Sequence, residues 1–325
     1  MRSSFIHLLW IAIVLGSLQV SHQLSQFYIN NLYTGPSMDG GESNPFKSID
    51  EAFKYVEDNI ENFHDLVFIF TLIATNTTYY WSNPSSLVYS KRIALTISGA
   101  NQSSERFGQD DDWCESLARL YIRADYEMTF PSSTSLRFEF MTLILQPGAS
   151  NKLENNTQAA ILSNSSEISF NMSCFVGNST AEGKPIIQLK IFDSDLLSMT
   201  NLIFQNVSTA ATFIVSESML QMNSVILKGS QLPFEIDTSP IVQIFGSSPD
   251  KPFNINITNL SLNFSTQGLF NNYLPSLFSI DQYHNISVLN FSLVNHEVKF
   301  RAPLFTISNS SQVTLQQFSL RNFTY

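Results

Sequence analysis

Hydrophobic residues recur along this chain in a fixed spacing: two alternate positions, a two-residue break, and two further alternate positions. The pattern starts at residues 136, 168, 197, 220, 255, 286 and 313, so one unit spans 23 to 35 residues. The copies are Leu136/Phe138/Met141/Leu143, Leu197/Met199/Leu202/Phe204, Leu220/Met222/Val225/Leu227, Ile255/Ile257/Leu260/Leu262, Ile286/Val288/Phe291/Leu293 and Val313/Leu315/Phe318/Leu320, with a degenerate copy from Ile168/Phe170. Alternation at period two predicts strands with one buried face. A unit this short cannot bury its apolar face alone, so the repeat predicts a solenoid.

The two-residue break predicts a corner, because both hydrophobic pairs face inward only if the chain turns there. Asn171, Asn201, Asn223, Asn259 and Asn290 lie in these breaks, and asparagine tolerates the left-handed backbone that a tight corner requires. Later units each add a third strand, with inward pairs Ile187/Leu189, Phe213/Val215, Val242/Ile244, Phe278/Ile280 and Phe305/Ile307. Three short strands per unit predict an all-β fold, a triangular parallel β-helix.

One amphipathic helix is expected near the start of the repeats, over about residues 48–61. Ser48 can cap it, and Glu51 completes a capping box. The apolar face of this helix consists of Ile49, Phe53, Val56 and Ile60. A buried strand is expected to follow from Asp65 to Thr71.

This region carries a family resemblance. The order strand, Gly40-Gly41 loop, Pro45-Phe46-Lys47-Ser48-Ile49, helix and strand resembles the opening of pectin-lyase-like right-handed parallel β-helix proteins, and residues 93–101 resemble their early coils. The resemblance covers about residues 24–325 and implies one right-handed parallel β-helix domain whose first coil is capped by the helix. It implies no particular activity, because the superfamily contains lyases, hydrolases, adhesins and non-enzymatic surface proteins.

Residues 1–21 are expected to be a secretory signal peptide. Arg2 precedes the apolar stretch Phe5–Leu15, which is too short to span a bilayer comfortably. A retained signal anchor is the alternative, and no transmembrane segment is expected after the signal. The predicted location is therefore outside the cell or on the extracellular face of the plasma membrane.

Secretion agrees with the N-x-[ST] triplets of the sequence. Fourteen begin at Asn76, Asn101, Asn155, Asn164, Asn171, Asn178, Asn206, Asn256, Asn259, Asn263, Asn285, Asn290, Asn309 and Asn322. The preferred glycosylation candidates are Asn76, Asn101, Asn155, Asn164 and Asn178. Turns that need asparagine and strands that use serine and threonine would also produce such triplets for structural reasons.

The chain has two cysteines, Cys114 and Cys174. In a secreted protein they can pair and close a loop of 60 residues across about two coils. Two free buried thiols are the alternative. The sequence contains no C-x-x-C pair, so a structural zinc site of the usual type is not predicted.

The acidic balance excludes some partners and suggests few sites. A net charge of −10 and a pI near 4.9 argue against nucleic acid as a partner. Asp193-Ser194-Asp195 is the most enzyme-like feature: on a strand, its two carboxylates would share an outward face about 7 Å apart, as in acid–base or calcium sites. Lys184 and Lys190 are the nearest basic residues, and an exposed turn or edge is the alternative.

Two further groups are weaker candidates. Asp110, Asp111 and Asp112 could bind calcium, but a solvated acidic loop is the alternative. Trp81 and Trp113 are expected in loops, where they would be candidates for carbohydrate contact. The inward phenylalanines of the repeats are expected to form a stacked core.

These features favour a non-catalytic secreted or cell-surface protein with a structural or recognition role. A signal peptide followed by a solenoid rich in Asn, Phe, Ile and Ser resembles large surface proteins of ciliates, some of which are similar to bacterial polymorphic outer membrane proteins. No cofactor is expected, and the partner would be an extracellular glycan or protein. The competing class is a polysaccharide lyase or glycoside hydrolase. Because the last unit has no polar cap, we expect a fragment, an early-terminated gene model, or a body that continues into a partner.

Overall fold

The computed structural model describes residues 25–35, 39–63, 66–74, 77–81, 93–100, 107, 113–123, 127–129, 134–146, 157–163, 167–176, 186–205, 213–216, 218–228, 242–246, 254–263, 273–274, 278–283, 285–294, 299–300, 305–310 and 312–321. Its helices are α2 (Ile49–Asp58), the 3-10 helix η1 (Ile60–Asn62) and α3 (Trp113–Ser116). Its strands are β1 (Ser25–Ile29), β2 (Val67–Leu72), β3 (Thr78–Trp81), β4 (Ala94–Gly99), β5 (Ala118–Arg123), β6 (Glu127–Thr129), β7 (Ser135–Glu139), β8 (Met141–Gln146), β9 (Thr157–Ser163), β10 (Glu167–Val176), β11 (Ile186–Phe192), β12 (Leu196–Gln205), β13 (Phe213–Ser216), β14 (Met219–Lys228), β15 (Val242–Phe245), β16 (Asn254–Asn263), β17 (Tyr273–Leu274), β18 (Phe278–Asp281), β19 (Asn285–Val294), β20 (Lys299–Phe300), β21 (Phe305–Ser308) and β22 (Gln312–Arg321).

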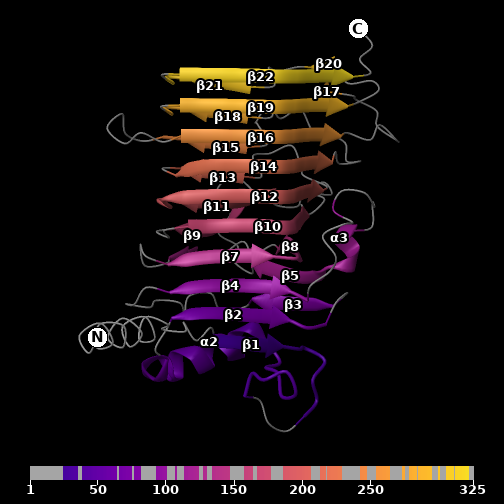
Figure 1. Ribbon diagram of the computed structural model, residues 1–325, viewed down its shortest axis with the longest axis vertical. Coiled ribbons are helices and arrows are strands. Elements are labelled where there is room, and N and C mark those ends of the chain that lie inside the picture. The colour runs from indigo at the N-terminus through magenta and orange to yellow at the C-terminus, as the bar shows by residue number, and fades with distance from the viewer. Residues whose placement is uncertain are drawn as a thin grey trace, which may run out of the picture.

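The described strands form two long sheets whose members come from successive repeats (Figure 1). The larger, 13-stranded sheet has the order β1-β2-β4-β7-β10-β12-β14-β16-β19-β22, and β8 joins β5 and β3 to it through β10. The 7-stranded sheet has the order β21-β18-β15-β13-β11-β9-β6, and β17 pairs with β20 separately. Every described strand pair is parallel. The fold is mostly β and compatible with a solenoid.

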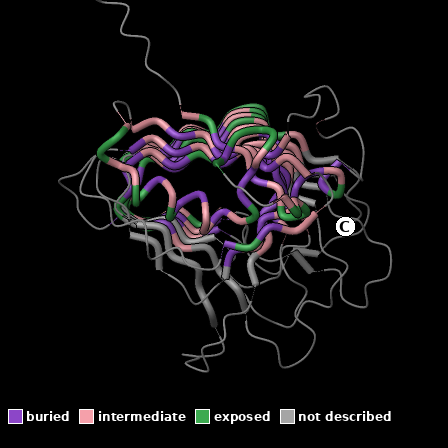
Figure 2. Tube along the Cα trace, turned by 90° about the horizontal axis from the view of Figure 1, so that it is seen from below, coloured by how far each residue is buried: buried purple, intermediate pink, exposed green. Residues whose placement is uncertain are grey.

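The hydrophobic repeat occupies equivalent register positions in the 13-stranded sheet. Ile255 of β16 pairs with Leu220 of β14 and with Ile286 of β19, and all three side chains are buried. Viewed end-on in Figure 2, the described repeats superimpose and buried residues line the space between the sheets. The aromatic members stack along the axis: Phe138 lies on Phe170 with ring centroids 5.2 Å apart. The predicted columns of apolar side chains are therefore present.

The corner within each unit is formed by the second residue of the two-residue break. This residue has a positive φ of 47° to 58° in all seven units, at Phe140, Met172, Asn201, Ser224, Asn259, Asn290 and Gln317. From β10 onward the corner lies inside one continuous ten-residue strand. The prediction that asparagine supplies the left-handed residue is correct at three corners. It is wrong for Asn171 and Asn223, which precede the left-handed Met172 and Ser224.

The strands of the 7-stranded sheet agree with the predicted third strand of each unit. Val242, Ile244, Phe278 and Ile280 are buried, as expected. The pairing of β11 differs by two residues from the prediction, because Leu189 and Ile191 pair with Phe213 and Val215. A shift of two keeps the same face inward, since side chains alternate with a period of two.

The N-terminal end of the sheets is covered by a loop and by α2. The Ser48 Oγ accepts the N–H of Glu51 at 3.1 Å, as a capping box requires. The Glu51 carboxylate accepts the N–H of Lys47 at 2.9 Å, one residue before the cap. Phe46 bridges to Ile29 of β1 and accepts from Asn30 N–H at 2.7 Å, so the outer edge of β1 is hydrogen-bonded to this loop.

Candidate ligand-binding surface

The short strand β3 presents four residues to alternating sides of the sheet. Tyr79 and Trp81 are buried, whereas Tyr80 is 54% exposed. The Tyr79 hydroxyl accepts the N–H of Ala74 at 3.0 Å and can donate to the carbonyl of Ile29 at 3.3 Å. Burial raises the pKa of the Tyr79 phenol above its usual value. These contacts anchor the inner side of β3 and leave the Tyr80 ring on the outer surface.

The neighbouring strand β5 places a second tyrosine beside Tyr80. Leu120 and Ile122 of β5 are buried, so Tyr121 lies on the outer side with Arg119. Tyr80 and Tyr121 are register partners, and their rings stack with centroids 5.4 Å apart and an interplanar angle of 28°. Outward Thr78 pairs with Arg119 in the same ladder. We call the set Thr78, Tyr80, Arg119, Tyr121 and the adjacent Ile144 the tyrosine face.

The tyrosine face combines flat apolar surface with hydrogen-bonding groups. Tyr121 pairs with Ile144 of β8, which extends the column by one aliphatic side chain. Aromatic rings on a rigid sheet bury large apolar area at little cost in side-chain entropy. The hydroxyls of both tyrosines, the Thr78 hydroxyl and the five N–H groups of Arg119 can bond a polar ligand laid on the rings. The chemistry suits a ligand that has an apolar face and a hydroxylated or acidic edge.

The two tryptophans expected in exposed loops are buried. Trp81 ends β3 on its inner side and stacks on Phe53 of α2, with centroids 5.3 Å apart. Trp113 lies in α3 and packs edge-on against Phe107. The prediction of carbohydrate contact by Trp81 and Trp113 is therefore wrong. Strict alternation along Thr78–Trp81 would have shown that Tyr80 is the outward aromatic residue. The pairing of Tyr80 with Tyr121 depends on the register between β3 and β5, which the sequence does not reveal.

Asp193, Ser194 and Asp195 form the bend between β11 and β12 and do not lie on a strand. Both aspartates are exposed, Asp193 has a φ of 50°, and buried Ser194 donates its N–H to Ser218 Oγ at 3.1 Å. Lys190 is half-buried on β11, and Lys184 lies outside the described residues. Across the described segments, no group of three or more His, Cys, Asp or Glu side chains could hold a metal ion. The triplet therefore serves as a turn that connects β11 to β12.

Several predicted site residues lie outside the part of the chain that the structure describes. They are the acidic residues Asp110, Asp111 and Asp112, the glycosylation candidates Asn76, Asn101, Asn155, Asn164 and Asn178, and the signal segment 1–21.

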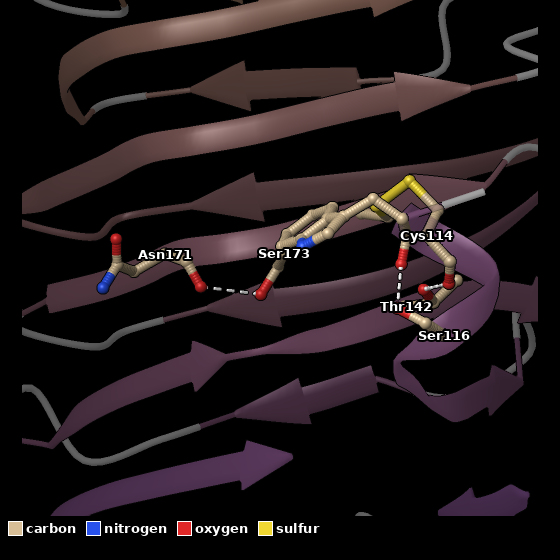
Figure 3. Close-up of a disulfide and its surroundings, with 7 residues drawn as sticks. Cys114, Ser116, Thr142, Asn171 and Ser173 are labelled. Carbon is tan, nitrogen blue, oxygen red and sulfur yellow. Dashed lines mark hydrogen bonds between the residues drawn. A yellow bond between two sulfur atoms is a disulfide. The ribbon is translucent and has the colours of Figure 1, made fainter. Parts of the chain in front are cut away.

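Cys114 and Cys174 form a disulfide that joins α3 to the outer side of β10 (Figure 3). Both residues are buried in a small cluster with Trp113, Leu117, Met172 and Ile203, separate from the main core. The Thr142 hydroxyl of β8 donates to the carbonyl oxygen of Cys114 at 2.6 Å. The sequence left pairing and free thiols open, and the structure has the paired form. This cluster covers the outer side of the sheet next to β5.

The chain matches no protein-family model, no curated protein and no solved structure. Among the helices within the described residues, none has both the length and the apolar character needed to cross a membrane.

Proposed function

We propose that the chain is a secreted or cell-surface right-handed parallel β-helix protein that recognises an extracellular glycan without chemical turnover. The parallel ladders support the architecture, and parallel strands joined by crossovers are almost always right-handed. The start of the chain and its many N-x-[ST] triplets support the secretory route. The resemblance to pectin-lyase-like proteins, with α2 as the first-coil cap, belongs to this proposal.

The stacked pair Tyr80–Tyr121 is the observation that carries the proposal. A tyrosine that is 54% exposed exposes a large apolar ring to water, and aromatic rings of this kind are typical of recognition surfaces. A pyranose ring has an apolar C–H face of similar size and hydroxyls at its rim. The Tyr80 ring face that Tyr121 does not cover matches the apolar C–H face, and Thr78 and Arg119 can bond the hydroxyls.

The proposal is tested by glycan-array binding with the secreted chain, followed by dissociation constants for variants against the best ligand. We expect Tyr80→Ala and Tyr121→Ala each to weaken binding about tenfold or more, equivalent to about 1.4 kcal/mol, because they remove the stacking surface. Tyr80→Phe keeps the ring and should retain most of the affinity.

Phe245→Ala is the matched control, because Phe245 is an exposed aromatic residue on β15 of the other sheet. Its loss should leave the affinity unchanged. Binding that is indifferent to both tyrosine variants, or a protein ligand in place of a glycan, would contradict the proposal. Glycan turnover with calcium that is lost in Asp193→Ala or Asp195→Ala would establish the hydrolase or lyase class instead.

A further inference from the structure

Strand β16 carries two N-x-[ST] triplets only three residues apart, and the structure gives their asparagines different environments. The triplets are Asn256-Ile257-Thr258 and Asn259-Leu260-Ser261. Because both belong to the same strand of the same repeat, the local geometry of the two asparagines can be compared directly. A third triplet, Asn290-Phe291-Ser292, lies at the equivalent corner of the next repeat.

Asn259 and Asn290 are parts of a hydrogen-bonded ladder that runs along the corner. The amide nitrogen of Asn290 donates to Asn259 Oδ1 at 2.9 Å, and that of Asn259 donates to Asn223 Oδ1 at 3.2 Å. Both residues have the left-handed backbone of the corner, with φ of 57° and 56°. A sugar on either amide nitrogen would replace one of its hydrogens and add bulk where strands are about 4.8 Å apart.

Asn256 has none of these constraints. It lies between buried Ile255 and Ile257, so its side chain is on the outer side of the sheet, where it is exposed. Its register partners are the exposed Gln221 and the half-buried Ser287. Within the described residues its amide makes no hydrogen bond, so a substituent on Nδ2 of this exposed residue would break no hydrogen bond to them.

We propose that Asn256 is an N-glycosylation site and that Asn259 and Asn290 stay unmodified in the ladder. The reaction joins Asn256 Nδ2 to the anomeric carbon of a lipid-linked oligosaccharide. The anomeric C–O bond to the pyrophosphate breaks, the lipid pyrophosphate leaves, and the amide loses one proton. The inference uses the secretory route of the proposed function but is independent of glycan recognition. Chains modified at Asn259 or Asn290 would fold poorly, so the secreted population is expected to lack them.

The test is secretion from eukaryotic cells, with peptide fragmentation that assigns each glycan to a residue. Asn256 should carry a glycan in most of the secreted chains. Asn256→Gln and Thr258→Ala should each remove one endoglycosidase-sensitive step of gel mobility, and Thr258→Ala leaves the asparagine in place. Asn259→Gln and Asn290→Gln are the matched controls, which should leave the mobility unchanged and lower the unfolding midpoint.

A second version with a foreign secretory leader in front of the full chain separates two failures. If the leader-bearing chain is secreted with Asn256 bare, or with the glycan on Asn259 or Asn290, the inference is wrong. If only the leader-bearing chain is secreted and Asn256 is modified there, the inference holds and the native secretory route of the proposed function is contradicted.

Discussion

The left-handed corner residues show that backbone geometry takes precedence over side-chain preference at this position. Met172, Phe140 and Gln317 adopt the same positive φ as the asparagines, although each such non-glycine residue costs about 1 kcal/mol. Each repeat stacks on the next only if the chain bends at the same position of the strand ladder in every repeat. Asparagine lowers the cost where consecutive corners can hydrogen-bond, as Asn259 and Asn290 do.

Two glycines lie beside such left-handed residues and have no space for a side chain. A Cβ at Gly99 would lie 2.0 Å from the carbonyl oxygen of Phe140, and one at Gly246 would lie 2.1 Å from that of Gln282. We expect Gly99→Ala and Gly246→Ala each to lower the free energy of unfolding by about 3 kcal/mol, because a backbone strand must move. Denaturant unfolding followed by circular dichroism measures this loss.

Gly41→Ala provides the control for these glycine variants. Its Cβ would meet only the side chain of exposed Asp39, at 3.0 Å. We expect a change in unfolding free energy of about 0.5 kcal/mol or less. Equal effects at Gly41 and Gly99 would show that the close approach of the Phe140 carbonyl does not restrict the corner.

At the scale of elements, α3 is a single helical turn that cannot be stable by itself. Its position on β8 and β10 depends on the Cys114–Cys174 disulfide, the hydrogen bond from Thr142 to Cys114, and the buried Trp113. The indole N–H of Trp113 has no hydrogen-bond partner within the described residues. Burying this N–H without a partner costs free energy, and the disulfide helps to offset that cost by holding α3 against the sheet.

The double variant Cys114→Ala/Cys174→Ala should lower the free energy of unfolding by about 4 kcal/mol. The bond closes a loop with a sequence separation of 60, and the loss of chain entropy in the unfolded state scales with that length. Unfolding midpoints of the wild type and the double variant, each measured with and without reductant, give the value.

Thr142→Val, on β8, weakens the attachment of α3 more mildly, since it removes only the 2.6 Å hydrogen bond from Thr142 to the carbonyl oxygen of Cys114. Its expected cost is about 1 kcal/mol. If the double cysteine variant costs no more than Thr142→Val, the cross-link does not stabilise the unfolding unit that contains α3.

Sequence reasoning was most effective where periodicity alone determines the structure. The alternation at Ile255/Ile257 and its equivalents predicted the buried columns, and Ser48 with Glu51 predicted the start of α2. It could not give the register that brings Tyr80 beside Tyr121, because these residues are 41 positions apart in sequence and their strands meet only in the folded parallel ladder. It left open whether Asp193 and Asp195 lie on a strand or in an exposed turn, and the structure places both in an exposed bend.

At the scale of the whole molecule, the two ends of the described sheets differ. The outer edge of β1 is covered by the loop around Phe46, whereas β22 presents inward-type residues to solvent. Val313, Leu315 and Phe318 are 43%, 47% and 41% exposed. Their register partners one repeat earlier, in β19, are fully buried. An apolar strand edge of ten residues is a template for pairing with another chain.

We therefore expect a chain of residues 1–325 expressed by itself, whatever follows it in the protein, to associate in a concentration-dependent way through β22, measurable by sedimentation velocity and light scattering. Val313→Lys/Leu315→Lys should suppress association at least severalfold, because stacking a second chain on this edge would bury the two added charges. Thr314→Lys/Gln316→Lys is the matched control: it adds the same two charges to the same strand on its outer side and should leave association largely intact. If all variants associate like the wild type, the contact lies elsewhere on the molecule. If Thr314→Lys/Gln316→Lys suppresses association as strongly as Val313→Lys/Leu315→Lys, the added charge and not the apolar edge is the cause.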